Sequence, residues 1–269
     1  MAAECLHESL KEAGCIGNIQ LITQKTTLAQ HDFLFLLFPI HSFNAPEAVY
    51  KWIDALDVVE GIPAAVIAVS GGGEIVPNRA GSLSSIKRLE KKGYVVNYDC
   101  TVVMPSNIIV GTHELLAVKL LEVLPSKVGK IVDDVLCGVR QRTTPPLIDR
   151  IVSTLGEAEK RYTGSFGKAI QVSSDCDGCG WCGLHCPAGN ITVIEGKVHF
   201  ENKCHLCLNC LYGCPRKALA AGKWKFVIVK EGYDLNEFKE RIPLTDPIDL
   251  NELAKGYLWK GVRKYLENS

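Results

Sequence analysis

The stretch "CDGCGWCGLHCP" (176–187) carries the most specific pattern in this 269-residue chain. Its four cysteines follow the spacing C-x2-C-x2-C-x3-C, and a proline comes directly after the last one. The same spacing recurs in "CHLCLNCLYGCP" (204–215), where each cysteine stands 28 residues after its counterpart. The sequence therefore contains an internal duplication, which we interpret as a repeated unit of strand, cysteine loop and short helix.

The segments around the two blocks repeat as well. "AIQVSSDC" (169–176) mirrors "KVHFENKC" (197–204), and "EGKVHF" (195–200) mirrors "AGKWKF" (221–226). Pro187 and Pro215 suit the first turn of a helix, so we expect a short helix after each block. Glycines within the first block permit unusual backbone angles and a close approach to a bound group.

This cysteine spacing is typical of iron–sulfur ligation. Three thiolates at i, i+3 and i+6 wrap one loop around a cluster, and the fourth, before the proline, ligates the other cluster of the pair. We expect the first [4Fe–4S] cluster to be held by Cys176, Cys179, Cys182 and Cys214. We expect the second to be held by Cys204, Cys207, Cys210 and Cys186. Two structural zinc sites are the alternative, but zinc favours two separated pairs of ligands.

Residues next to these cysteines have smaller expected roles. His185 and His205 each lie beside a ligand cysteine, and we expect them in the surroundings of the clusters or at the surface. We expect Trp181 and Tyr212 to cover the clusters. The four scattered cysteines show no paired spacing, so we expect buried thiols that pack as small apolar side chains: Cys5, Cys15, Cys100 and Cys137.

Composition excludes several classes of protein. Lysine plus arginine number 30 and aspartate plus glutamate also 30, which argues against a nucleic-acid binder. The longest apolar run covers only residues 33–40, too short for a membrane span. The N-terminal residues lack the apolar stretch of a secretory signal, and clustered cysteines without a disulfide framework favour a reducing compartment. We therefore expect a cytoplasmic protein.

Helical and strand patterns alternate in the front part of the chain. We expect helices over 2–14, 45–56, 82–94, 114–124 and 127–136, and strands over 18–22, 32–39, 64–70 and 94–104. Continuous apolar runs such as "AAVIAVS" (64–70) are typical of strands buried on both faces of a parallel sheet. The fold class expected here is a doubly wound α/β sheet with helices on both faces.

The chain divides into three predicted parts. We expect an α/β domain over 1–165, a cysteine domain over 168–226 and a C-terminal tail over 227–269, with the first boundary near 164–168. The tail should begin with the strand-like "KFVIVK" (225–230) and end in a helix over 254–268. That helix has an apolar side, and we expect it to dock on its own domain. Contact with a membrane surface or an acidic redox partner is the alternative.

On these motifs, residues 168–226 resemble the bacterial two-cluster ferredoxins. That resemblance implies low-potential transfer of one electron per cluster, with no substrate chemistry of its own. The order of the front elements resembles a flavodoxin, whose strand order is 2-1-3-4-5. The combination, over about residues 1–240, is similar to the flavodoxin-like and ferredoxin fusion proteins of anaerobic bacteria and archaea.

The flavodoxin resemblance implies FMN as a candidate cofactor, held by two loops after buried strands. These loops are "FPIHSFNAP" (38–46) and "SGGGEIVPN" (70–78). The residues implied at the flavin ring are His41, Ser42, Phe43, Asn44, Gly71, Gly72 and Gly73. The alternative at both loops is a plain turn, with a surface or capping role for His41.

One part of a flavodoxin is missing, because no strand and no phosphate-binding loop precede the first predicted helix. We therefore do not expect tight FMN binding by the chain as written. The favoured explanation is a mis-assigned start in a longer native protein. The alternative is that the strands expected at 18–22 and 32–39 close up and pair directly.

Three functions follow as hypotheses. The leading one is an electron carrier rather than a substrate-transforming enzyme, with two clusters coupled to a flavin if one binds. The second is a ferredoxin-type subunit whose flavin-free front domain docks on a larger redox complex. The third is a non-redox protein with structural zinc. For the first two, the partners are a redox donor and a redox acceptor.

Overall fold

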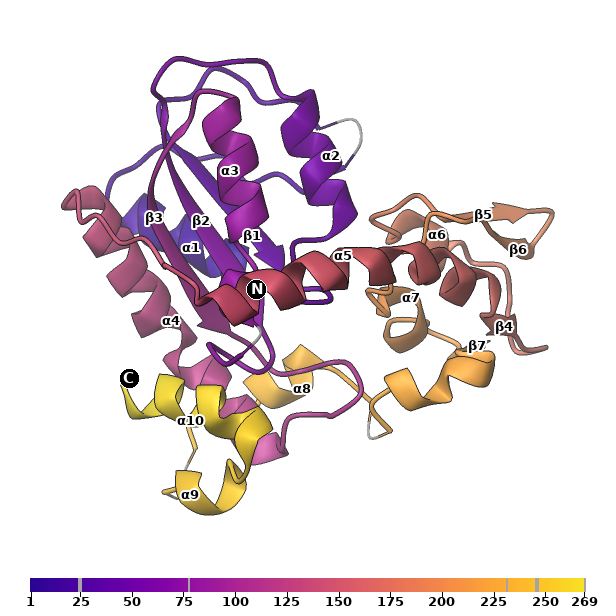
Figure 1. Cartoon of the computed structure of the whole chain (residues 1–269). Coiled ribbons are helices and arrows are strands. Elements are labelled where there is room, and N and C mark those ends of the chain that lie inside the picture. The colour runs from indigo at the N-terminus through magenta and orange to yellow at the C-terminus, as the bar shows by residue number, and fades with distance from the viewer. Residues whose placement is uncertain (24–25, 77, 231, 245–246, 269) are drawn as a thin grey trace. The chain divides into compact units, whose positions relative to one another are not determined.

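The structure is a computed structural model that describes residues 1–23, 26–76, 78–230, 232–244 and 247–268 (Figure 1). The chain divides into two compact units. Unit 1 comprises Met1–Pro105, Thr112–Glu157 and Asn236–Ser269, and unit 2 comprises Ser106–Gly111 and Ala158–Leu235. The segment 106–111, within the predicted front domain, thus belongs with the cysteine region.

A three-stranded parallel sheet forms the centre of unit 1. Its strands are β1 (Leu34–Pro39), β2 (Pro63–Ser70) and β3 (Val95–Val103), in the order β1-β2-β3. The middle strand is buried on both faces, since residues 64–68 are at most 2% exposed. The parallel sheet predicted from the continuous apolar runs is confirmed.

Helices cover both faces of this sheet. They are α1 (Ala2–Glu12), α2 (Glu47–Ala55), α3 (Leu83–Lys91) and α4 (Glu114–Leu136), with a short 3₁₀ helix η1 (Asn78–Ala80). Asp99 of β3 accepts a hydrogen bond from Ser82 at the start of α3, while Tyr98 donates one to Asp134 of α4. Successive residues of a strand point to opposite faces, so α3 and α4 lie on opposite sides of the sheet. This is an α/β fold.

The apolar core between the sheet and two of the helices explains why these segments fold as they do. Alternate residues of β1 and β2 pack with the buried sides of α2 and α3, which contribute Tyr50, Trp52, Ile53, Ile86 and Leu89. On the other face, α1 packs on α4. Among the described residues, no helix has a stretch long and apolar enough to cross a bilayer.

The strand expected over 18–22 is wrong. These residues form neither helix nor strand, and both Ile19 and Leu21 are exposed. The alternative pairing of this segment with β1 is wrong as well, because β1 pairs only with β2 within the described residues. A strand needs a hydrogen-bonded neighbour, and five partly apolar residues without one stay irregular. The two helices expected over 114–136 are one helix that continues through Pro125.

The C-terminal segment belongs to unit 1. After α8 (Leu235–Lys239) come α9 (Leu250–Leu253), the 3₁₀ turn η3 (Tyr257–Trp259) and α10 (Lys260–Glu267). The single helix expected over 254–268 is wrong, because Gly256 adopts φ 85° and interrupts it. Val262 and Leu266 are buried against Leu116 and Leu120 of α4, so the segment docks on its own unit.

Unit 2 contains two small antiparallel sheets and the cysteine loops. Helix α5 (Leu147–Lys168) leads into it, so the expected boundary at 164–168 falls within a helix. The further elements are β4 (Gln171–Val172), α6 (Trp181–Leu184), β5 (Ile191–Ile194), β6 (Lys197–Phe200), α7 (Asn209–Tyr212), β7 (Leu219–Ala220) and the 3₁₀ helix η2 (Gly222–Val227). Strand β4 pairs with β7, and β5 pairs with β6.

Two local expectations for this region are wrong. The residues of "KFVIVK" form the end of η2 and one isolated bridge between Ile228 and Ile108, not a strand. The short helices α6 and α7 lie within the cysteine blocks, so each ends before the last cysteine and Pro187 or Pro215 follows it in a turn or irregular segment. The third cysteine of each block therefore sits on a helix, and the fourth in the chain after it.

Candidate metal centre

The 28-residue duplication extends to the conformation of the backbone. Helices α6 (181–184) and α7 (209–212) occupy matching positions. Three matching pairs share a left-handed φ: Gly178 at 70° with Leu206 at 54°, Gly180 at 77° with Leu208 at 62°, and Gly189 at 57° with Lys217 at 49°. Residues other than glycine rarely adopt such angles. The second block therefore keeps the loop shape of the first even where glycine is absent.

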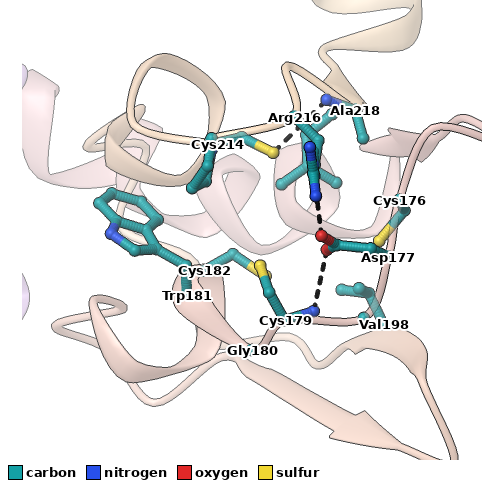
Figure 2. A pocket seen from close by; sticks show the side chains of 13 residues that line it. Cys176, Asp177, Cys179, Gly180, Trp181, Cys182, Val198, Cys214, Arg216 and Ala218 are labelled. Atoms are coloured by element: carbon teal, nitrogen blue, oxygen red, sulfur yellow. Dashed lines mark hydrogen bonds and ion pairs between the residues drawn. The ribbon is translucent and has the colours of Figure 1, made fainter.

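One pocket gathers the four cysteines expected for the first cluster (Figure 2). Cys176, Cys179 and Cys182 come from the first block, and Cys214 comes from the second. Burial raises the pKa of the Cys182 thiol, and the neighbouring Cys176 and Cys214 raise this pKa further. The fourth cysteine of one block thus lies with the first three of the other.

The second expected set shows the same crossing. Burial raises the pKa of Cys204 to about 11, and the charges of Cys207 and Cys186 act in the same direction. The pKa of Cys210 rises to about 12, first through burial and then through Cys207, with smaller contributions from its other neighbours. Those neighbours include Cys182 of the first set, so the two sets lie next to each other.

Backbone amides point at the sulfurs of both crossing cysteines. The amide of Asn190 donates to Cys186 Sγ at 3.3 Å, and the amide of Ala218 donates to Cys214 Sγ at 3.4 Å. Asn190 and Ala218 are themselves 28 residues apart, so this hydrogen bond is part of the duplication. Hydrogen bonds to a thiolate stabilise its negative charge and help to set the reduction potential of a bound cluster.

The donor set suits a pair of clusters. Among the described residues, no three His, Cys, Asp or Glu side chains are arranged to hold a single metal ion. In a [4Fe–4S] cluster each of the four thiolates binds a different iron, so the sulfurs need not converge on one point. Two neighbouring sets of four cysteines, crossed between the blocks, match this chemistry.

An ion pair that the sequence analysis missed joins the two parts of the first set. Arg216 Nε donates to Asp177 Oδ2 at 2.8 Å, and Asp177 Oδ1 accepts from the amide of Cys179 at 3.1 Å (Figure 2). The hydrogen bond from Arg216 holds the pKa of Asp177 below its usual value. The matching positions of the duplication are His205 and Ala188, so only the first set has this tie. The sequence holds one sign of this ion pair, because an acidic residue follows Cys176 and a basic residue stands two positions after Cys214.

Helices α6 and α7 interlock through a second reciprocal contact. A methyl group on Gly213 would overlap the ring of Trp181, so this indole lies directly on the glycine before Cys214. The matching residue of Trp181 is Asn209, whose Nδ2 donates to the carbonyl of His185 at 2.9 Å. His185 also stacks on Trp181 with 4.1 Å between ring centroids. Trp181 also lines the first pocket, and its role as a cover for a cluster stays a prediction.

The loop after β1 is a closed turn. His41 and Asn44 form a bridge, while Ser42 and Phe43 adopt φ of 46° and 64°. Asn44 is fully buried. Its side-chain Nδ2 donates to the carbonyl of Ser153 at 2.6 Å, and its Oδ1 accepts from the Ser153 hydroxyl at 2.7 Å. The side chain of Asn44 therefore fixes α5 to this turn, a structural role.

The glycine loop after β2 is covered by the chain itself. Ser70 Oγ accepts hydrogen bonds from the amides of Gly72 and Gly73 at 3.2 and 3.1 Å. A methyl group on Gly73 would lie 2.8 Å from the carbonyl carbon of Gly261, the second residue of α10. Pro77 of this loop lies outside the described residues. With α10 on Gly73, the loop does not fit a flat ring on that face.

The four scattered cysteines are only partly as expected. All twelve cysteines are free thiols. Cys100 lies in β3, and burial followed by the charge of Asp99 raises its pKa. Cys5, Cys15 and Cys100 are half-buried, so they fit the expectation of buried thiols only in part. Cys137 is exposed, so the expectation is wrong for that residue. Cys137 follows the last residue of α4, where the helix end faces water.

The chain was compared with known protein families, curated proteins and solved structures. None of the three comparisons gave a match. The assignment of the site therefore rests on the cysteine spacing and on the geometry of the two sets.

Proposed function

We propose that this chain is an iron–sulfur electron-transfer protein that holds two [4Fe–4S] clusters in unit 2. The observation that carries the proposal is the pocket in which Cys214 joins Cys176, Cys179 and Cys182. In the two-cluster motif, the fourth cysteine of each block ligates the cluster of the other block, and the cysteine spacing alone predicts this crossing. When bound, each cluster takes up and releases one electron.

The chain's own residues would prepare this site in three ways. Amides of Asn190 and Ala218 donate to sulfurs of the two crossing cysteines. The exposed Asp177–Arg216 pair ties the first loop to the segment that carries Cys214. Partial burial of the thiols among apolar residues such as Leu208 and Ile191 limits access of water. Hydrogen bonds, charges and burial of this kind set the reduction potential of a bound cluster.

We further propose that unit 2 has a ferredoxin-like fold, which is supported by the repeated loops and by the pairing of β4 with β7 and of β5 with β6. Unit 1 is flavodoxin-like, supported by three adjacent parallel strands in chain order with helices on both faces. All twelve cysteines lie among the described residues and none forms a disulfide, which suits a reducing compartment, so we propose the cytoplasm as the location.

A second candidate concerns unit 1, which we propose is a flavin-free docking module for a larger redox complex. The supporting observation is that the residues at the start of α10 pack directly on the glycine loop, where the flavodoxin resemblance places the ring of FMN. Asn44 is a second residue that the resemblance implies at the ring, and its side chain is hydrogen-bonded to Ser153 instead. In this candidate, electrons enter and leave through the clusters alone.

One anaerobic preparation tests both candidates. We expect about eight irons and eight sulfides per chain, with no stoichiometric zinc or flavin. We also expect absorbance at about 400 nm that bleaches with dithionite. Zinc in place of iron would overturn the electron-transfer proposal. One equivalent of tightly bound FMN beside intact clusters would overturn only the docking module.

A further inference from the structure

Two segments far apart in the sequence run side by side in unit 2. The loop 106–111 lies antiparallel to residues 226–230, with a bridge between Ile108 and Ile228. The amide of Ile109 donates to the carbonyl of Val227 at 3.0 Å. A methyl group on Gly111 would lie 2.6 Å from Val229 Cγ1. We call residues 106–111 and 226–230 the paired segments.

The paired segments are attached directly to the second cysteine set. Tyr212, at the end of α7, donates its hydroxyl hydrogen to the carbonyl of Asn107 at 2.8 Å and accepts from the amide of Val229 at 2.9 Å. Asn107 Nδ2 in turn donates to the carbonyl of Cys207 at 3.5 Å. A hydrogen-bonded route therefore leads from a cysteine of the second set to this part of the surface.

The paired segments carry exposed apolar side chains. Ile109, Val110 and Phe226 are 61%, 43% and 64% exposed. Three exposed lysines, Lys223, Lys225 and Lys230, lie within four residues of Phe226 along the chain. The lysines that form ion pairs among the described residues are Lys51, Lys119, Lys130 and Lys203, so these three are not among them. Residues 222–230 include no acidic side chain, and Glu231, which follows Lys230, lies outside the described residues. We call the six residues Ile109, Val110, Phe226, Lys223, Lys225 and Lys230 the lysine patch.

The loop of the first set offers no such group of lysines. Residues 171–180 carry the exposed Asp175 and Asp177 and no basic side chain, and Asp177 is paired with Arg216. An apolar centre with a charged rim is the usual anatomy of a transient protein interface. A rim of unpaired lysines attracts an acidic partner and raises its rate of encounter.

We propose that the lysine patch is the docking surface for an acidic one-electron carrier protein that exchanges electrons with the cluster of the second set. The inference rests on the proposed function. No bond forms or breaks in the exchange: a reduced cluster loses one electron, and the redox centre of the partner gains it. The partner is acidic because the patch offers three exposed lysines that form no ion pair within the described part of the chain, and it is an electron carrier because the paired segments lead to Cys207.

The first test uses a redox-inert probe on the oxidised full-length protein. Hexacyanochromate(III) is an anion whose paramagnetism broadens the NMR signals of residues that it approaches. We expect it to broaden the methyl signals of Ile109 and Val110, and we expect the cation hexaamminechromium(III) not to do so. The variant K223E/K225E/K230E should lose the broadening. Equal broadening by both ions, or broadening retained in the variant, would overturn the proposal that the lysine patch attracts an anionic partner.

The second test measures electron transfer by stopped flow. The dithionite-reduced protein is mixed with anionic hexacyanoferrate(III) or with cationic hexaamminecobalt(III), each of which takes one electron. At low salt, K223E/K225E/K230E should slow the anionic oxidant about tenfold and accelerate the cationic one. About 0.5 M salt should remove most of this difference, because it screens the charges.

A matched variant separates a local effect from one of net charge. K11E/K91E/K197E changes the net charge by the same amount at three exposed lysines outside the patch. We expect it to alter either rate less than about threefold. Equal effects of the two triple variants would overturn the inference while leaving the clusters in place. A preparation without iron would instead overturn the proposed function, and the NMR map would still report whether the patch prefers anions.

Discussion

At the scale of single residues, Lys217 is held in a left-handed conformation that its counterpart Gly189 adopts without strain. Lys217 has φ 49° and an exposed side chain, while Gly189 has φ 57° and open space where a methyl group would lie. A side chain in this region costs about 1–2 kcal/mol. Glycine avoids that cost but loses more backbone entropy on folding.

We therefore predict that Lys217→Gly raises the free energy of unfolding by about 0.5–1 kcal/mol. The relief of backbone strain exceeds the extra backbone entropy that glycine loses on folding by this amount. Urea denaturation under anaerobic conditions measures it. The matched change Gly189→Ala, which meets no neighbouring atom, should lower the same quantity by about 1 kcal/mol. Lower stability of Lys217→Gly would show that the left-handed backbone at this position is not strained.

Cysteine positions were predictable at this scale, but their supporting contacts were not. Spacing along the chain is covalent, so the motif at 176–187 and its repeat carry the ligand assignment by themselves. The Asp177–Arg216 pair depends on the crossing of two blocks, and the sequence indicates only that opposite charges exist there. Leu206 and Leu208 give no local sign of left-handed angles, which the surrounding structure imposes.

At the scale of elements, Tyr212 joins α7 to the paired segments. Its hydroxyl makes one hydrogen bond to Asn107 and one to Val229, and burial raises its pKa. We predict that Tyr212→Phe costs about 1–2 kcal/mol of stability, because a carbonyl and an amide lose their partner. Hydrogen exchange at the amide of Val229 should become about tenfold faster or more.

Tyr257 provides the control for that change. It is exposed, and its hydroxyl donates to the carbonyl of Val76 at 3.2 Å, where water can replace it. Tyr257→Phe should therefore change stability by less than about 0.5 kcal/mol. Equal losses in the two variants would argue that Tyr212 adds nothing beyond a surface hydrogen bond.

The start of α10 depends on close contact with the glycine loop. A methyl group on Gly261 would overlap the carbonyl oxygen of Gly72 and lie 3.0 Å from Ile75 Cγ2. We predict that Gly261→Ala lowers the free energy of unfolding by about 2 kcal/mol. Gly129→Ala, in the middle of α4 with no atom within 4 Å, should instead raise it by about 0.5–1 kcal/mol. Chemical denaturation that finds no loss in Gly261→Ala would mean that α10 is not packed on the loop.

Strand prediction succeeded where burial on both faces dictated it. The run at 64–70 can only be a central strand in a parallel sheet, and β2 is buried throughout its middle. The segments at 18–22 and 225–230 have similar local composition, but each lacks a neighbouring strand in a ladder among the described residues. Strand formation is decided by partners from elsewhere in the chain, which a short apolar run does not specify.

At the scale of the whole molecule, the sequence predicted two kinds of unit but not how the chain is distributed between them. The loop 106–111 leaves β3 of unit 1, packs in unit 2 and returns to α4. The C-terminal segment after residue 235 returns to unit 1 and covers its glycine loop. Both features arise from long-range packing, for which a single sequence carries no periodic signal.

Crossed ligation is the central claim, and iron content in two double variants tests it most directly. Cys176 and Cys214 lie in the same set, whereas Cys176 and Cys186 lie in different sets, although the latter two share a sequence block. We predict that Cys176→Ala/Cys214→Ala retains about four irons per chain and that Cys176→Ala/Cys186→Ala retains almost none. The reverse result, with four irons in the second variant and none in the first, would contradict crossed ligation.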